Sequence, residues 1–133
     1  MTSPRGVLET CLYAEDLASA HRFYTEVLGM EVLSYAEDRM LVLRCGPGVL
    51  ILFRASKTQI PDAGVPPHGT TGAGHMAFTA SAAEIDAWAV RLTDRQVPIE
   101  HKIWPNESRS LYFRDPAGNV LEFAMPAVWS LED

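Results

Sequence analysis

Two carboxylates and one imidazole occupy positions where charged side chains are uncommon. Glu9, His75 and Glu122 each lie within a short apolar run that is typical of a β-strand. Burying such a charge without a partner costs on the order of several kcal/mol, so each group needs a counter-charge, a hydrogen bond or a metal ion. Convergence of the three on one sheet face would favour a metal site. The alternatives are a hydrogen-bonded core histidine and a salt bridge from Glu9 to a basic residue.

An internal duplication indicates how these residues are positioned. Residues 39–44 (RMLVLR) match residues 109–114 (RSLYFR) at a shift of 70. Continued without a gap, the alignment places Gly48 on Gly118 and Leu52 on Glu122. Upstream, the strand-like run 6–13 matches the run 74–79, which makes Glu9 equivalent to His75. Each copy ends in two strands joined by a Gly- and Pro-bearing turn, the pattern of a β-hairpin.

A helix follows the first strand of each copy. The first is expected to start near Asp16 and to end at Gly29, and the second to start at Ser81 with Glu84 three residues later, as in a capping box. One further strand is expected in each half, at 30–35 and at 97–103. Each half is therefore β-α-β-β-β, which predicts an α+β fold. We expect a single domain over 1–133, with a first module at about 5–55, a linker at 56–72 and a second module at about 73–127.

Alternation along the strands predicts one apolar face for the helices to cover. It holds Leu8, Leu12, Leu41, Leu43, Val49, Ile51, Phe53, Met76, Phe78, Leu111, Phe113, Leu121 and Phe123. The opposite face is expected to carry Glu9, His75 and Glu122, with Leu50, Leu52, Ser110 and Tyr112 beside them. A half of about 60 residues is marginal alone, so each should pair with another half, of the same chain or of a second subunit.

Composition excludes several classes of partner. A net charge of −6 argues against nucleic acid binding. No apolar run approaches the roughly 20 residues that span a bilayer, and no signal-peptide core is present at the start. Cys11 and Cys45 are too few and too far apart for a disulfide framework. These features together predict a cytoplasmic protein.

Several motifs resemble those of the vicinal oxygen chelate superfamily, which includes glyoxalases, bleomycin-resistance proteins and ring-cleaving extradiol dioxygenases. The matching runs are YAEDL from Tyr13, FY at Phe23, LG at Leu28, GHMAF from Gly74 and DPAGNVLE from Asp115. They cover nearly the whole chain in the expected order. The resemblance implies two βαβββ modules that form a cupped, mostly antiparallel mixed sheet with helices on the outer face, paired across a homodimer.

The resemblance also implies a divalent metal at the floor of the cup. The family's ligand positions fall on Glu9, Leu52, His75 and Glu122, of which Leu52 cannot ligate and Glu9 replaces a common histidine. The remaining set, Glu9, His75 and Glu122, suits Mn²⁺, Fe²⁺, Zn²⁺ or Mg²⁺. Glu9 and Glu122 are also the candidate catalytic carboxylates, since one left unligated could act as a base.

Substrate contacts are expected from the remaining side chains around the cup. These are Ser110 and Tyr112 as hydrogen-bonding groups, Trp104 as an aromatic wall, and Leu52. His68, in the Gly- and Pro-rich linker, is either an ordinary exposed loop residue or part of a lid.

Besides a scaffold whose site residues make only structural ion pairs, two functions follow as alternatives. The first is a metal-dependent lyase, isomerase or dioxygenase whose metal chelates two vicinal oxygens of a small molecule and stabilises an enolate or oxyanion. The second is a non-catalytic protein that sequesters a bleomycin-like antibiotic or another aromatic compound. The three retained ligands favour the enzyme, whereas Leu52, the acidic charge and the tryptophans favour the binder.

Overall fold

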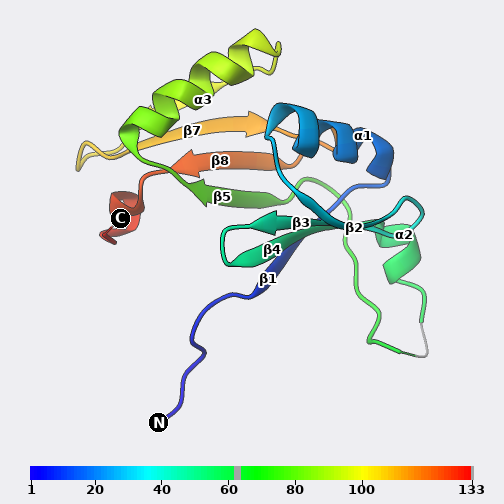
Figure 1. Cartoon of the computed structure of the whole chain (residues 1–133). Helices are drawn as coiled ribbons and strands as arrows, with labels where there is room; N and C mark the ends of the chain where they lie inside the picture. Colours follow the sequence, from blue (N-terminus) through cyan, green and yellow to red (C-terminus); the bar gives the residue numbers. More distant parts are fainter. Residues whose placement is uncertain (62–63, 133) are drawn as a thin grey trace. The chain divides into compact units, whose positions relative to one another are not determined.

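The computed structural model describes residues 1–61 and 64–132, and the chain divides into two compact units, Met1–Gly72 and Ala73–Asp133. Both units contain the β-α-β-β-β order that the sequence predicts (Figure 1). No described helix has the length and apolar character that crossing a bilayer requires.

The first unit contains a four-stranded sheet with strand order β1-β4-β3-β2. Strands β1 and β4 are parallel, and the other neighbours are antiparallel. Its elements are β1 (Glu9–Tyr13), α1 (Leu17–Arg22), a π-helical turn (Phe23–Val27), β2 (Val32–Ala36), β3 (Met40–Cys45), β4 (Gly48–Phe53) and a short helix α2 (Ala55–Thr58). Helix α2, which lies at the start of the expected linker, was not predicted from the sequence.

The second unit repeats this topology with strand order β5-β8-β7-β6. Its elements are β5 (His75–Thr79), α3 (Ala82–Asp94), β6 (Glu100–Ile103), β7 (Arg109–Arg114), β8 (Val120–Ala124) and a 3-10 turn (Pro126–Trp129). Strands β5 and β8 are parallel, as β1 and β4 are. The predicted α+β fold with two βαβββ modules is confirmed.

Local sequence explains where the two helices begin. The Asp16 carboxylate accepts a hydrogen bond from the Ser19 backbone N–H at 3.0 Å and caps α1. At α3, Ser81 and Glu84 form the expected capping box, with reciprocal bonds of 3.1 and 3.0 Å. These bonds lower the pKa of Glu84, because they favour its ionised form. Gly29, at φ +70°, follows the first helical segment, as its position predicts.

The covered face of the second sheet matches the expectation. Trp88 of α3 stacks on Phe123 at 4.5 Å between ring centroids, and Phe113 stacks on Phe123 at 5.4 Å. Leu111 and Leu121 are fully buried. Aromatic stacking of this kind adds about 1 kcal/mol per pair beyond the area buried.

In the first sheet the expected faces of β4 are wrong. Glu9 pairs with Val49 and Cys11 with Ile51, so Ile51 shares the face of Glu9. Leu52 pairs with Leu12 of β1 and is 0% exposed, on the face that α1 contacts. Leu50 and Leu52 thus belong to the core, and the predicted position of Leu52 beside Glu9 is corrected.

A one-residue difference between the two hairpins explains the error. Arg44 pairs with Val49, five positions later, whereas Arg114 pairs with Val120, six positions later. The ungapped alignment therefore slips by one residue after the turn, and such a slip moves every side chain to the other face. Ile51, not Leu52, is the structural equivalent of Glu122.

Candidate functional site: a histidine–carboxylate pair beside a pocket

His75 and Glu122 meet on the face of the second sheet that α3 does not cover. Nε2 of His75 lies 3.3 Å from Oε1 of Glu122, and the two side chains come from the parallel neighbours β5 and β8. The Glu122 side chain is only 8% exposed, whereas that of His75 is 54% exposed. A nearly buried carboxylate thus faces an imidazole that ligands can reach.

The backbone fixes the tautomer of this imidazole. Nδ1 of His75 lies 2.8 Å from the carbonyl oxygen of Val120. A carbonyl can only accept, so Nδ1 carries the proton and the neutral ring has its lone pair on Nε2, beside Glu122. Histidines that bind metals commonly donate their other N–H to a backbone carbonyl in this way.

The separation of the two donor atoms suits a shared cation. Two ligands about 2.0–2.2 Å from a tetrahedral Zn²⁺ lie roughly 3.3–3.5 Å apart, close to the 3.3 Å between Nε2 and Oε1. Within residues 1–61 and 64–132, no group of three or more His, Cys, Asp or Glu side chains is gathered for metal binding. The structure therefore brings together two of the three predicted ligands.

Glu9, the third predicted ligand, belongs to the first unit. It is the exposed first residue of β1, on the face it shares with Ile51. On the same face, the Tyr13 hydroxyl lies 2.6 Å from Nδ1 of His68, whose ring packs edge-on against Phe53 at 4.8 Å. His68 is thus held against the sheet by its hydrogen bond, although its side chain remains exposed.

Tyr112 lies next to the histidine–carboxylate pair in the second sheet. It is the β7 neighbour of Glu122, and its ring centroid is 6.4 Å from that of His75. Burial raises the pKa of the Tyr112 hydroxyl, and the negative charge of Glu122 raises it further. The hydroxyl therefore stays protonated and can donate a hydrogen bond.

A pocket of about 600 Å³ lies on the same sheet and is lined by residues of the second unit alone. Its lining comprises Pro98, Ile99, Glu100, His101, Lys102, Trp104, Tyr112, Phe113, Arg114 and Val120. The volume is in the range of small-molecule sites. Two predicted substrate contacts, Trp104 and Tyr112, line it, and Ser110 supports Trp104 through a 3.0 Å bond from the indole N–H. Lys102 and Glu100 carry no signal in the sequence that predicts a site, because charged residues on an exposed strand are ordinary.

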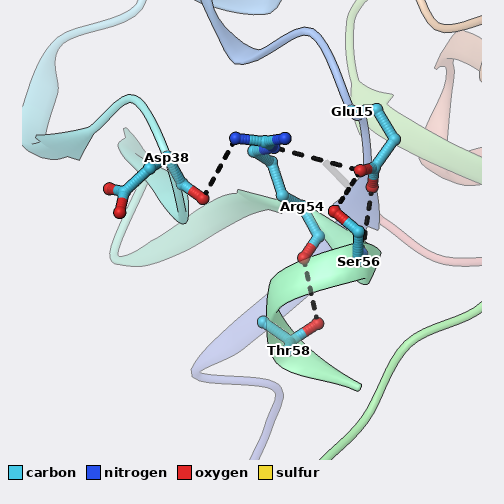
Figure 2. Close-up of polar contacts among 5 residues, drawn as sticks. All are labelled: Glu15, Asp38, Arg54, Ser56 and Thr58. Atoms are coloured by element: carbon cyan, nitrogen blue, oxygen red, sulfur yellow. Dashed lines mark hydrogen bonds and ion pairs between the residues drawn. The ribbon is translucent and has the colours of Figure 1, made fainter. Parts of the chain in front are cut away.

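A polar cluster at the end of β4 serves the fold of the first unit (Figure 2). The Glu15 carboxylate accepts bonds from the Ser56 hydroxyl and, at 3.2 Å, from the Ser56 N–H. Nε of Arg54 lies 3.9 Å from the same carboxylate. These contacts lower the pKa of Glu15, chiefly through the Ser56 hydroxyl. The cluster joins the segment before α1 to the start of α2.

Comparison with known proteins identifies the family. The family model described as the Glyoxalase/Bleomycin resistance protein/Dioxygenase superfamily matches residues 6–123. A lactoylglutathione lyase from Agrobacterium tumefaciens has a similar structure, with a TM-score of 0.94 and 36% identity over 98% of this chain and 100% of that one. A glyoxalase/bleomycin resistance protein/dioxygenase from Nocardioides gives a TM-score of 0.74 at 25% identity, over 94% of this chain and 85% of that one. A putative glyoxalase family protein from Bacillus anthracis, 19% identical, shares the fold with a TM-score of 0.73, over 94% of this chain and 98% of that one. The chain belongs to the Glyoxalase/Bleomycin resistance protein/Dioxygenase superfamily.

Proposed function

We propose that this protein is a metal-dependent enzyme of the glyoxalase class, a lyase or isomerase acting on a small molecule with two adjacent oxygen atoms. The single observation that carries the proposal is the His75–Glu122 pair, in which Nε2 and Oε1 are 3.3 Å apart and the second ring nitrogen is bonded to a backbone carbonyl. The lactoylglutathione lyase at 36% identity supports the lyase assignment over the dioxygenase assignment.

In this proposal His75 and Glu122 hold a divalent cation (Mn²⁺, Fe²⁺, Zn²⁺ or Mg²⁺), and Glu9 of another module completes the ligand set. When bound, the cation supplies a Lewis acid that stabilises negative charge on substrate oxygens. Val120 holds the His75 ring in the ligating tautomer, and the protonated Tyr112 hydroxyl donates a hydrogen bond toward Glu122 or the substrate. Of the two candidate catalytic carboxylates, Glu9 is the more exposed, and it is the proposed base when it is not bound to the cation.

We further propose a homodimer, because the two modules carry different parts of the site. The sequence 56–72 between them is long enough to pass the second module to a partner chain. Light scattering should then give about twice the 14.7 kDa chain mass. A monodisperse monomer that still binds metal would contradict this arrangement.

The cytoplasm is the proposed location. Cys11 and Cys45 are both free thiols, which is the usual state in a reducing compartment.

The deciding experiment is metal analysis by mass spectrometry on protein purified without an affinity tag. We expect about one transition-metal ion per site in the wild type and its loss in His75→Ala. The matched control is His21→Ala, because His21 lies in the first unit and contacts Tyr35 instead of a carboxylate. No metal in the wild type after incubation with each of the four ions would contradict the proposal.

A second measurement separates a ligand role of Glu122 from a structural role. Replacing a buried charge by an apolar side chain of similar size is often neutral or stabilising. We therefore expect Glu122→Leu to unfold in urea within about 1 kcal/mol of the wild type when both are metal-free, yet to bind no metal. A loss of more than about 2 kcal/mol in the metal-free protein would indicate a structural hydrogen-bonding role instead.

The alternative, a non-catalytic binder of aromatic compounds, is favoured by one observation, the Trp104- and Tyr112-lined pocket. It predicts that the affinity for an aromatic ligand is the same with and without metal and is unchanged in His75→Ala. Binding measured with and without a chelator distinguishes the two functions.

A further inference from the structure

We propose that Lys102 and Trp104 form a subsite for a planar group that carries a negative charge, so that the substrate is an aromatic or heteroaromatic acid. The proposal rests on the proposed function in so far as the rest of that substrate reaches His75 and Glu122. The subsite itself is built from β6, β7 and the residues that follow β6.

Trp104 is held in one orientation by a buried partner. Its indole N–H donates a 3.0 Å hydrogen bond to the hydroxyl of Ser110, which is 0% exposed. Rotating the ring would leave the Ser110 oxygen buried without this donor, which opposes the rotation. The ring that lines the pocket is therefore pre-organised, and it offers a flat apolar surface without further loss of side-chain entropy.

Lys102 supplies the positive charge next to that surface. Its ammonium lies over the Trp104 ring, 5.3 Å from the ring centroid. Among the ion pairs in the described part of the chain, none involves Lys102, whereas Arg44, Arg54 and Arg109 each face a carboxylate. The three donors of the ammonium are thus available to an anion seated at the indole.

Neighbouring charges determine where along the pocket an anion can sit. Glu100 is two residues from Lys102 on β6, on the same face, and is paired with Tyr112. A ligand carboxylate beside Glu100 would be repelled, whereas one beside Lys102 would be attracted. Arg114, at the other end, already donates to the Gly118 carbonyl at 2.8 Å. The Lys102 end is therefore the preferred place for the charge.

The register connects this subsite to the histidine–carboxylate pair. Tyr112 is the strand neighbour of Glu122 on one side and of Glu100 on the other. Neighbouring strands are about 4.8 Å apart, so β6 lies roughly 10 Å from β8 along the sheet. A substrate that engages both ends is about this long, with its oxygen atoms near His75 and Glu122 and its charged ring at Trp104.

The test uses the metal-free full-length protein and three probes: 2-naphthoate, the uncharged 2-naphthamide and the non-aromatic cyclohexanecarboxylate. Binding is followed through the indole N–H NMR signal of Trp104, which is assigned by its loss in Trp104→Phe. We expect saturable shifts with 2-naphthoate and affinities at least about fivefold weaker for the other two probes. Lys102→Gln should weaken 2-naphthoate about tenfold, whereas Lys57→Gln, which removes the other lysine of the chain, should leave it unchanged.

Equal binding of 2-naphthoate and 2-naphthamide, an unchanged affinity in Lys102→Gln, or no shift at Trp104 would each overturn the proposal. Because no metal is present, these outcomes do not depend on the proposed catalytic function. Conversely, a protein that binds 2-naphthoate as expected but never binds metal would retain the subsite and refute the enzyme.

Discussion

The two units have one topology and two very different open faces, meaning the sheet faces opposite the buried leucines and phenylalanines. In the first unit Cys11, Ile51 and Phe53 make the open face largely apolar. In the second, His75 and Glu122 occupy the corresponding strands. The covered faces are alike because each must be apolar to form a core. The stability of the fold depends less on which residues occupy the open faces. The histidine–carboxylate pair is therefore confined to one copy of the module.

The hairpins of the two units differ in construction as well as in length. The first connects β3 and β4 through Gly46 and Pro47. In the second, the Asp115 carboxylate accepts hydrogen bonds from the N–H groups of Ala117 and Asn119 at 3.0 and 2.9 Å. Asn119, only 1% exposed, in turn accepts from the Gly74 N–H at 2.8 Å. Its side chain thus joins the longer turn to the residue that precedes β5.

The largest expected effect tests the register that distinguishes positions 51 and 52. Leu52→Glu would place a carboxylate in the core of the first unit and should cost about 4 kcal/mol or more, enough to prevent folding. Ile51→Glu should also destabilise the fold, because Ile51 is only 7% exposed, but by less than Leu52→Glu, which places the charge at a position that is 0% exposed. Urea unfolding or, for Leu52→Glu, the yield of folded protein measures both. Equal losses, or a larger loss at position 51, would contradict the observed register.

An intermediate effect tests the difference between the hairpins. Asn119→Ala leaves the Gly74 N–H without its acceptor and removes one partner of Asp115, so we expect a loss of about 2–3 kcal/mol in urea unfolding. Pro47→Ala in the shorter hairpin removes no side-chain hydrogen bond and should cost under about 1 kcal/mol. If the two variants were equally stable, the polar network would not be what stabilises the second turn.

The smallest effect concerns the Glu15 cluster, which is found in the first unit. Ser56→Ala removes the hydrogen bond that contributes most to lowering the pKa of Glu15, so this pKa should rise toward its ordinary value. A carboxyl group with a lowered folded-state pKa contributes stability above its unfolded pKa, about 4.3, and loses it as the pH falls through the folded pKa. In Ser56→Ala this small acid-side loss should begin at higher pH.

Carbon-13 NMR titration of the Glu15 carboxyl group measures this change directly. Glu84 is an internal control, since its pKa is lowered by Ser81 alone and should not move. An unchanged Glu15 titration in Ser56→Ala would show that the backbone N–H of Ser56 and the charge of Arg54 hold the pKa down without the hydroxyl.

Much of this protein follows from its sequence. Apolar periodicity and the caps at Asp16 and Ser81 are local signals, so the order of elements and the helix starts could be predicted. The duplication and the motif around Asp115 indicated the family. His75 and Glu122 were identifiable because charged groups in apolar strands require partners, and the structure brings them within 3.3 Å. The metal-ligand roles of Glu9, His75 and Glu122 stay predictions.

Only the tertiary structure decided the faces of β4 and the location of the pocket. A single extra residue in the second hairpin reverses which side chains point to the core, and strand periodicity fits either register when every residue from Val49 to Phe53 is apolar. The pocket depends on Lys102 and Trp104 lying beside Ser110 across β6 and β7, a pairing set by hydrogen bonds between strands. The sequence determined which charged side chains need partners, because the free-energy cost of burying a charge depends on the residue itself. The register of the strands determined which residues they contact.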